Sequence, residues 1–267
     1  MSEDPVLFTQ HDGVACLTLN APDMLNAMNR RGFELLIEAM DRIDSEPEIR
    51  ALILTGAGSA FCSGASIQSD FFLADDPAKR HSATKEIMDS CGTPLMEKLA
   101  KLRVPTIAAV NGPAGGGGVG LALACDLVIA APAAKFVLTF TPKLGMIPDL
   151  ATVWQFARSI GRSRTIRAAY LGTPISAEEA ADVGLIWKVV PGESLMEETW
   201  SIARQLADGP TQAYSRVRQI VDAATMLSLR EQVELEAEIQ PRLMATQDMV
   251  EGARAFLAKR KPIFKGH

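Results

Sequence analysis

A run of four consecutive glycines, Gly115 to Gly118, constrains this chain more than any other feature. An apolar run at 106–110 precedes it, as a buried strand would, and a second apolar run at 121–125 follows it, as the start of a helix would. Glycines carry no side chain, so neighbouring groups can approach this backbone closely. Their N–H groups, at the start of a helix, form a receptor for negative charge. The glycine run therefore predicts a strand-to-helix turn that faces an anion.

The same run matches the G-x-G-x-x-G pattern of dinucleotide-binding turns through Gly115, Gly117 and Gly120. That motif needs an acidic residue about 20 positions later for the ribose, whereas Asp126 comes too early and Asp149 too late. No G-K-S or G-K-T follows the glycines, which excludes a phosphate-binding P-loop. A nucleotide is therefore the disfavoured anion.

An enolate oxygen is the alternative anion. A thioester carbonyl becomes an enolate when the neighbouring carbon loses a proton, and preorganised backbone N–H donors stabilise that charge by about 3 kcal/mol each in a water-poor site. One donor would come from Gly116-Gly117-Gly118, and the second requires another loop of small residues. Ser63-Gly64-Ala65, which follows an apolar strand at 49–55, is the candidate. Together the two loops predict an oxyanion hole.

Composition narrows the class of protein further. The net charge of −5 argues against a nucleic-acid partner, because such proteins carry a basic stripe. No apolar run approaches the roughly 20 residues that cross a bilayer, and the acidic, polar start is not a secretory signal. The four cysteines lack C-x-x-C spacing and nearby histidines, which predicts free thiols in the cytoplasm and no metal site.

Along the chain, strand and helix signals alternate up to about residue 191, and helical periodicity dominates from 192 onward. Strands are expected at 14–19, 49–55, 104–110, 127–130, 136–138 and 185–190, and helices from Asn29, over 83–102, at 150–160 and 163–171, and after Ser176. Residues 68–82, with Phe71-Phe72-Leu73 and the solvated His81, are interpreted as a mobile flap. This order predicts an α/β core followed by an α-helical segment.

The sequence resembles the crotonase superfamily, the enoyl-CoA hydratase/isomerase family. The resemblance spans nearly the whole chain in the family's order, at Leu25-Asn26-Ala27-Met28, Ala60-Phe61-Cys62-Ser63-Gly64-Ala65, Ala108-Ala109-Val110-Asn111-Gly112 with the glycine run, Ala124-Cys125-Asp126, Ile175-Ser176-Ala177-Glu178-Glu179-Ala180, Gly184-Leu185-Ile186 and the ending from Glu251 to Lys265. It implies a spiral of ββα units with the acyl-CoA site at 1–191, and a C-terminal helical trimerisation region at 192–267. It also implies an acyl-CoA thioester as substrate, no cofactor beyond that coenzyme A, and a homotrimer or dimer of trimers.

The resemblance also assigns site residues. By position, Ala65 and Gly117 would be the two oxyanion donors. Phe256 and Lys259 match positions that contact the CoA nucleotide of a neighbouring subunit in relatives. The remaining positions expected to bind substrate or CoA are Ala27, Ser63, Ile67, Gly116 and Phe140.

The expected reaction follows from which acids are missing. Hydratases of the family use two glutamates, one three residues after the oxyanion glycine and one in the loop after the next strands. Here the first position is Gly120, and the second falls at Thr141 or Pro142. Since addition of water needs a group that holds and deprotonates it, standard hydration is disfavoured.

Asp149 is the remaining candidate acid. It occupies a position where a subset of relatives, the Δ3,Δ2-enoyl-CoA isomerases and the ring-epoxide isomerases of phenylacetyl-CoA breakdown, place a single acid/base. One carboxylate suffices for a 1,3-proton shift, and an apolar site would raise its pKa toward a useful value. The competing interpretation is that Asp149 caps a helix beginning near Leu150. Cys62, beside the site, is interpreted as an apolar filler.

Three activities therefore stay open on the sequence alone. The favoured one is an isomerase that shifts a double bond or a ring-epoxide bond, with Asp149 as acid/base. Hydration with Asp149 alone is the second, and a catalytically silent acyl-CoA binder is the third. A thioester dehalogenase is disfavoured, because Phe140 stands where that group carries a tryptophan.

Overall fold

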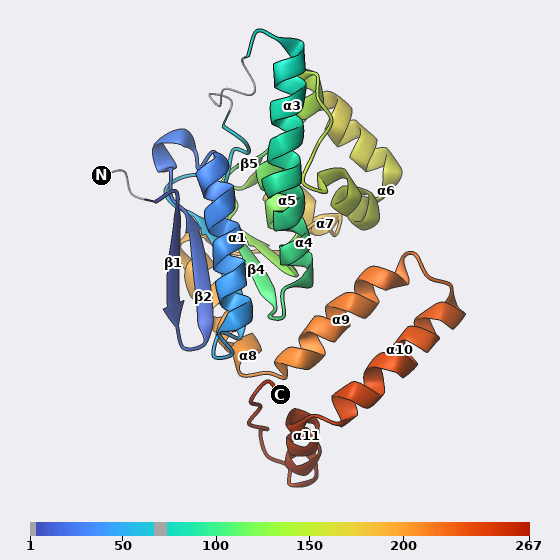
Figure 1. Ribbon diagram of the computed structural model, residues 1–267. Helices are drawn as coiled ribbons and strands as arrows, with labels where there is room; N and C mark the ends of the chain where they lie inside the picture. The colour runs from blue at the N-terminus through green and yellow to red at the C-terminus, as the bar shows by residue number, and fades with distance from the viewer. Residues whose placement is uncertain (1–3, 67–73) are drawn as a thin grey trace.

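The computed structural model describes residues 4–66 and 74–267. Two sheets form its centre (Figure 1). The larger has the order β1-β2-β3-β4-β6-β9, and the smaller has the order β5-β7-β8. The strands are β1 (Val6–His11), β2 (Val14–Leu19), β3 (Ala51–Gly56), β4 (Thr106–Val110), β5 (Ala114–Gly115), β6 (Leu127–Ala130), β7 (Lys135–Val137), β8 (Ile175–Ser176) and β9 (Lys188–Val189).

The larger sheet is parallel except at its first strand. β1 and β2 form an antiparallel hairpin, and β2, β3, β4, β6 and β9 pair in parallel. β3 and β4 are buried along almost their whole length, because helices cover both faces of the sheet. The carboxyl ends of the parallel strands therefore meet at one edge, and the turns that follow β3 and β4 lie there.

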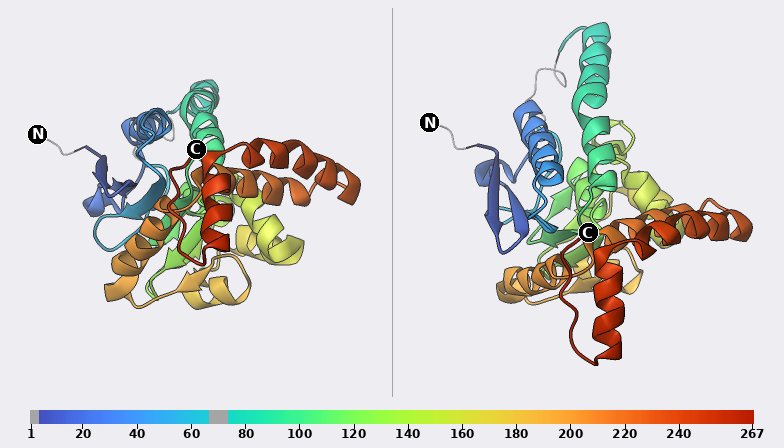
Figure 2. Two further views of the ribbon diagram at one scale, coloured as in Figure 1. Left: turned by 90° about the horizontal axis from the view of Figure 1, so that it is seen from below. Right: turned by 60° about the horizontal axis from the view of Figure 1, so that its bottom comes forward.

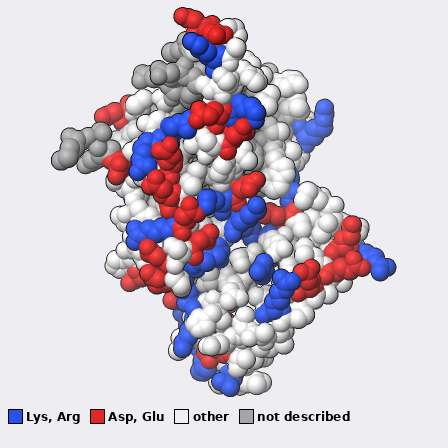
Figure 3. All heavy atoms as spheres, viewed as in Figure 1, with Lys and Arg blue, Asp and Glu red and all other residues white. Residues whose placement is uncertain are grey.

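The helices are α1 (Arg30–Ser45), α3 (Pro77–Ile87), α4 (Thr93–Lys101), α5 (Gly117–Leu123), α6 (Thr152–Leu171), α7 (Ala177–Asp182), α8 (Leu195–Ala207), α9 (Thr211–Ala224), α10 (Leu229–Met244) and α11 (Gln247–Leu257). The Asn29 side chain caps α1 by accepting the N–H of Gly32. The inner sides of α1 and α4 join the main apolar core, and α8 packs with a second apolar cluster on the other face of the sheet. The outer surface of α1, α3 and α4 carries interspersed acidic and basic side chains (Figure 3).

The segment before β4 differs from its expected form. The predicted flap at 68–82 is helical from Pro77, because Asp76 caps α3 by accepting the N–H of Ala78. The helix expected over 83–102 is divided by a π-helical turn, Met88–Gly92, which lies between α3 and α4. Ile67 and the cluster Phe71-Phe72-Leu73 lie outside the described residues.

Two other expectations need adjustment. β1 was not anticipated from the sequence. The strand expected at 185–190 is reduced to Lys188–Val189. The two helices expected at 150–160 and 163–171 are confirmed, because the non-helical Gly161, with a φ of +76°, divides α6 between them.

The last three helices extend away from the sheets (Figures 1 and 2). Arg218 on α9 ties this arm to the core by pairing with Asp126, and it also donates to the carbonyls of Leu102 and Val104. Arg50 donates to the carbonyl of Phe264 and so holds the C-terminal tail. The division at 191/192 stays a prediction, since α8 packs on the core sheet while α9 to α11 extend beyond it. None of the described helices combines the length and apolar character that crossing a membrane requires.

Candidate active site

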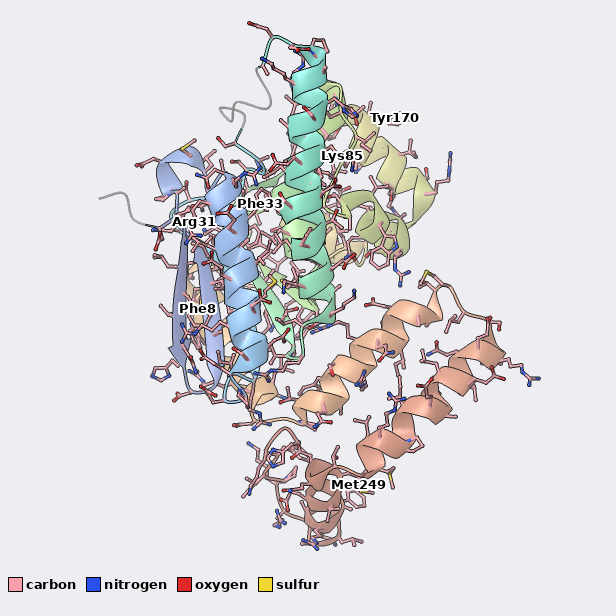
Figure 4. All side chains as sticks on the ribbon, in the orientation of Figure 1. Phe8, Arg31, Phe33, Lys85, Tyr170 and Met249 are labelled. Atoms are coloured by element: carbon pink, nitrogen blue, oxygen red, sulfur yellow. The ribbon has the colours of Figure 1, made fainter. Side chains whose placement is uncertain are left out.

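A cavity of about 90 Å³ lies where the turns after β3 and β4 meet helices α1 and α3 and the π-helical turn Met88–Gly92. Its walls are largely apolar, with Asp149 as the one carboxylate among the described lining residues. Phe33 lies on the side of α1 that faces α3 (Figure 4). The lining residues are Met28, Phe33, Cys62, Ser63, Gly64, Ala65, Thr84, Ile87, Met88, Gly92, Gly116, Gly117, Gly118, Leu121, Thr139, Phe140, Leu144, Met146, Asp149 and Leu150.

The two small-residue loops predicted to form the oxyanion hole lie in contact. The N–H of Gly115 donates to the carbonyl of Cys62 at 2.8 Å, which joins the loops. Gly64 has a φ of +96°, and a β-carbon there would lie 3.1 Å from the nitrogen of Gly117. Only glycine tolerates both that dihedral and that approach. The close packing of the 63–65 loop against the glycine run is thus a direct consequence of Gly64.

The backbone N–H groups of Ala65 and Gly117 lie at this junction. The Met28 N–H donates to the Gly64 carbonyl, and the Ser66 N–H donates to the Met28 carbonyl, at 2.8 Å each. The Ala65 N–H lies between these two bonds and takes no part in the pairing. Gly117 is the first residue of α5, so its N–H precedes the hydrogen-bond ladder of that helix. Neither N–H donates a hydrogen bond to another residue in the described ranges. Both residues line the cavity, so both donors are available to a bound molecule.

Asp149 lies next to the Gly117 donor. A β-carbon built on Gly117 would be 3.4 Å from Oδ1 of Asp149. Burial in this apolar cavity raises the pKa of the Asp149 carboxyl to about 6, and a hydrogen bond from its own backbone lowers it by less. A carboxyl that titrates near neutral pH can both accept and return a proton.

The backbone around Asp149 has an unusual form. Leu150 and Ala151 both have left-handed dihedrals, with φ of +47° and +57°. The N–H and the hydroxyl of Thr152 both donate to the Asp149 carbonyl, at 3.0 and 2.7 Å. Helix α6 therefore begins at Thr152, with Ala151 at the capping position. The interpretation of Asp149 as the helix cap is wrong, because the two left-handed residues separate its side chain from the helix end.

The positions of the two hydratase glutamates hold no acid. A β-carbon at Gly120 would lie 2.4 Å from the Leu150 carbonyl oxygen and 2.6 Å from the Thr152 hydroxyl. Backbone thus fills the space that a glutamate side chain would need. Thr141 donates its hydroxyl to the Met146 carbonyl at 2.9 Å. Neither Thr141 nor Pro142 lines the cavity.

The remaining predicted residues divide into two groups. Ser63, Gly116 and Phe140 line the cavity, whereas Ala27 lies beside its wall residue Met28 without lining it. Phe256 is 84% exposed at the end of α11, and Lys259 is exposed just beyond it. The structure places these two outside the cavity lining, and Ile67 lies outside the described residues.

The structure also gives the surroundings of Cys62 and His81, two side chains that the sequence analysis named. Burial raises the pKa of the Cys62 thiol to about 11, so the thiol lines the cavity as an apolar group. His81 is exposed on α3 and does not line the cavity.

Sequence reasoning missed the contribution of the helices. Phe33 on α1, Thr84 and Ile87 on α3, and Met88 and Gly92 in the π-helical turn all line the cavity. The spacing of 84, 88 and 92 places them on one side of consecutive turns, which was the available signal. The uncertain boundaries of the 83–102 helix hid it.

Comparison with known proteins decides the family. The family model described as enoyl-CoA hydratase/isomerase matches residues 9–267. The chain belongs to the enoyl-CoA hydratase/isomerase family. The 1,2-epoxyphenylacetyl-CoA isomerase of Escherichia coli K12 is 41% identical over 254 residues, covering 95% of each chain. A relative from Rhodobacter capsulatus named "Probable enoyl-CoA hydratase" is 36% identical over 266 residues, covering both chains fully.

Solved structures in the enoyl-CoA hydratase/isomerase family share the fold. The enoyl-CoA hydratase of Bacillus anthracis matches with a TM-score of 0.89 at 32% identity, covering 98% of this chain and 100% of that one. The family resemblance and the crotonase fold expected from the sequence motifs are therefore confirmed. The protein is an enzyme of this family, and the names of its relatives include both isomerases and hydratases.

Proposed function

We propose that the protein is an acyl-CoA isomerase that uses Asp149 as its only acid/base. One observation carries this proposal. Asp149 is the one carboxylate among the described residues of the cavity, its pKa is raised to about 6, and it lies beside the Gly117 donor. A single group of this kind matches a reaction in which one proton leaves a carbon and returns to another.

The proposed steps balance with one carboxylate. The thioester carbonyl of a 3-enoyl-CoA accepts hydrogen bonds from the N–H groups of Ala65 and Gly117. The Asp149 carboxylate removes the proton on the α carbon, and the electron pair becomes a dienolate whose oxygen those donors stabilise. Asp149, now protonated, returns the same proton to the γ carbon, which leaves a 2-enoyl-CoA. No cofactor enters beyond the coenzyme A of the substrate.

A ring epoxide is the second substrate form within this proposal. The relative from Escherichia coli carries the name 1,2-epoxyphenylacetyl-CoA isomerase and is 41% identical. Removal of the α proton and its return elsewhere would serve both substrates, because the enolate and the base are the same. We therefore place 1,2-epoxyphenylacetyl-CoA beside 3-enoyl-CoA thioesters as a substrate to be tested.

Hydration is the competing function, and the names of several relatives favour it. It would require Asp149 alone to hold and deprotonate water. The filled space at Gly120 argues against it, since no second acid can enter from that position.

The proposed assembly is a homotrimer or a dimer of trimers. Its support is the arm formed by α9 to α11, which extends from the core and exposes apolar side chains such as Val221, Val233 and Phe256. In such an assembly, Phe256 and Lys259 would reach the CoA nucleotide in a neighbouring subunit.

The test compares three reactions in one preparation. Ultraviolet absorbance of the conjugated thioester rises when 3-hexenoyl-CoA isomerises and falls when crotonyl-CoA is hydrated, and 1,2-epoxyphenylacetyl-CoA is followed by chromatography. We expect isomerisation without hydration, and a loss of about 10³-fold in kcat/KM for Asp149→Asn. Asp182→Asn, which removes an exposed carboxylate from α7, is the matched control and should match wild type. Full activity of Asp149→Asn, or hydration as the dominant reaction, would contradict the proposal. Failure of all three reactions with acyl-CoA still bound would identify a silent binder.

A further inference from the structure

Leu150 connects the oxyanion donor to the far wall of the cavity. Its Cδ1 lies 2.9 Å from where a β-carbon on Gly117 would be, and its Cδ2 lies 3.3 Å from where a β-carbon on Gly92 would be. One buried side chain therefore spans the distance from the glycine run to the junction of α3 and α4. Any acyl group that extends from a thioester carbonyl at Gly117 passes along this side chain.

The far wall itself is the π-helical turn Met88–Gly92. The N–H of Thr93 donates to the Met88 carbonyl five residues earlier, which defines the wide turn. Gly92 has no side chain, and the tip of Met88 occupies the space above it, with Sδ 3.2 Å and Cε 3.1 Å from the position of a Gly92 β-carbon. Turns of this kind recur at functional sites because they re-aim side chains. Here the tips of Met88 and Leu150 both lie within 3.3 Å of the Gly92 β-carbon position, and both residues line the cavity.

The surroundings of Met88 indicate what it contacts. Met28, Phe33 and Ile87 line the cavity together with Met88, so this apolar wall accepts hydrocarbon and not the phosphates of coenzyme A. The cavity volume of about 90 Å³ is smaller than the roughly 150 Å³ that holds one benzene molecule in a protein interior. An unbranched methionine has three rotatable bonds and adapts to what it contacts. It is therefore the part of this wall that can yield.

We propose that Met88 sets the upper size limit of the acyl group. The class of substrate selected is a compact acyl chain of about six carbons or a single ring. The Met88 side chain moves enough to admit that group, and longer chains are rejected because the tips of Met88 and Leu150 converge on the space above Gly92. This inference rests on the proposed acyl-CoA site, and it concerns binding and not the proton transfer.

The decisive experiment measures binding without turnover. Isothermal titration gives the Kd of hexanoyl-CoA, phenylacetyl-CoA and decanoyl-CoA, all of which lack the double bond or epoxide that reacts. In wild type we expect decanoyl-CoA to bind at least about tenfold more weakly than hexanoyl-CoA, since one misfit methylene is worth about tenfold or more. Met88→Ala should reduce that ratio about tenfold, because it removes the tip that blocks the longer chain.

A second variant should act in the opposite direction. Gly92→Ala adds a methyl group that must displace the tip of Met88 by a few tenths of an ångström toward the cavity. Gly92 has a helical φ of −61°, so alanine is tolerated by the backbone. We expect Gly92→Ala to weaken phenylacetyl-CoA about tenfold while weakening hexanoyl-CoA less. This variant keeps the proposal testable if Met88→Ala does not fold.

Met96→Ala is the matched control. Met96 lies two turns further along, on α4, where it is also partly buried against the main core without lining the cavity. Its loss should leave the ratio of the two Kd values at the wild-type level. If Met88→Ala folds, an unchanged ratio of the two Kd values in that variant would overturn the size limit. If Met88→Ala does not fold, equal weakening of phenylacetyl-CoA and hexanoyl-CoA in Gly92→Ala would overturn it. Activity on 3-hexenoyl-CoA with no size selectivity would refute this inference alone, whereas selective binding without isomerisation would refute only the proposed function.

Discussion

The two walls of the cavity differ in what they are made of. On the side of the glycine run, backbone packs against backbone, and a β-carbon at Gly118 or Gly120 would lie 2.4 Å from a carbonyl oxygen. Beside the glycine run, residues 140–150 present side chains to the cavity, among them Phe140, Met146 and Asp149. The first wall fixes where a thioester oxygen would be bound, and the second supplies whatever acid or base the reaction uses.

Within one pocket, the backbone of one wall would bind the thioester oxygen, and the side chains of the other wall would carry out the proton transfer. The oxyanion wall admits no new side chain without moving a neighbouring strand or loop. The side-chain wall can change its acid without disturbing the backbone donors. The cavity therefore holds Asp149 as the one carboxylate among its described lining residues, and the two positions expected for hydratase glutamates hold no acid.

The most direct test of the difference between the two walls is to add a side chain to the wall formed by the glycine run. Gly120→Ala places a methyl group against the Leu150 carbonyl and the Thr152 hydroxyl, and such overpacking costs about 1–3 kcal/mol or more. At about 2–4 °C per kcal/mol, the melting temperature should fall by about 2–12 °C in a thermal scan. Gly120→Glu should fold worse still and should gain no hydratase activity.

Gly252→Ala is the control for that prediction. Gly252 lies inside α11, where a β-carbon would make an ordinary 3.4 Å contact with Phe264. Its melting temperature should equal or exceed that of wild type, because alanine favours the helix. A Gly120→Ala variant as stable as wild type, or a folded Gly120→Glu variant that hydrates crotonyl-CoA, would show that the wall is not closed.

The pH dependence of the reaction sharpens the role of the side-chain wall. The free enzyme must hold Asp149 as the carboxylate to remove a proton, and its pKa is about 6. The value of kcat/KM should fall about tenfold for each pH unit below 6 and reach a plateau above 7. A profile that stays flat from pH 5 to 8 would remove Asp149 from the role of base.

Asp149 should also lower the stability of the folded protein. Its folded pKa, about 6, lies above the unfolded value of 3.8, so ionisation above pH 6 favours the unfolded chain. The difference between the two pKa values corresponds to about 3 kcal/mol, so Asp149→Asn should melt about 6–12 °C higher than wild type at pH 8. This advantage should shrink as the pH falls from 6 and vanish below about 4, where the carboxyl is protonated in both states. A constant difference across that range would indicate an effect unrelated to charge.

The smallest expected effect concerns the loop that carries Asp149. Ala151 has a φ of +57°, which costs a residue with a β-carbon about 1 kcal/mol. Ala151→Gly relieves this strain but makes the unfolded chain more flexible, so we expect a net gain of about 0.5 kcal/mol in urea unfolding. A loss of stability would mean that the methyl group of Ala151 has a packing role that outweighs the strain.

The sequence predicted the two-loop oxyanion arrangement and the fold, because both depend on local signals. Gly64 and the glycine run mark tight turns wherever they occur, and the apolar strands before them indicate a buried parallel sheet. The proximity of Asp149 to Gly117, and its elevated pKa, were expected from family position and an apolar environment. Its catalytic role stays a prediction.

What the sequence could not predict depends on contacts between distant segments. The missing acid at Gly120 was visible, but the closure of its space by Leu150 joins residues 30 positions apart. The helix-cap interpretation of Asp149 failed because two consecutive left-handed residues without glycine are not a local preference of leucine or alanine. The start of α3 at Pro77 was also missed, because the charged composition of residues 75–80 concealed it.

Leu150 also restricts how this enzyme can diversify. Its side chain touches both the oxyanion glycine and the π-helical turn, and its backbone directly follows Asp149. A substitution there that enlarged the pocket would also shift the carboxylate, so selection for a new substrate and selection for the old chemistry would oppose each other at this residue. Thr84 and Ile87 on α3 and Met88 in the π-helical turn have no such double constraint. Evolution or directed mutagenesis toward new acyl-CoA substrates should therefore accumulate changes on α3 and in that turn and leave residue 150 unaltered.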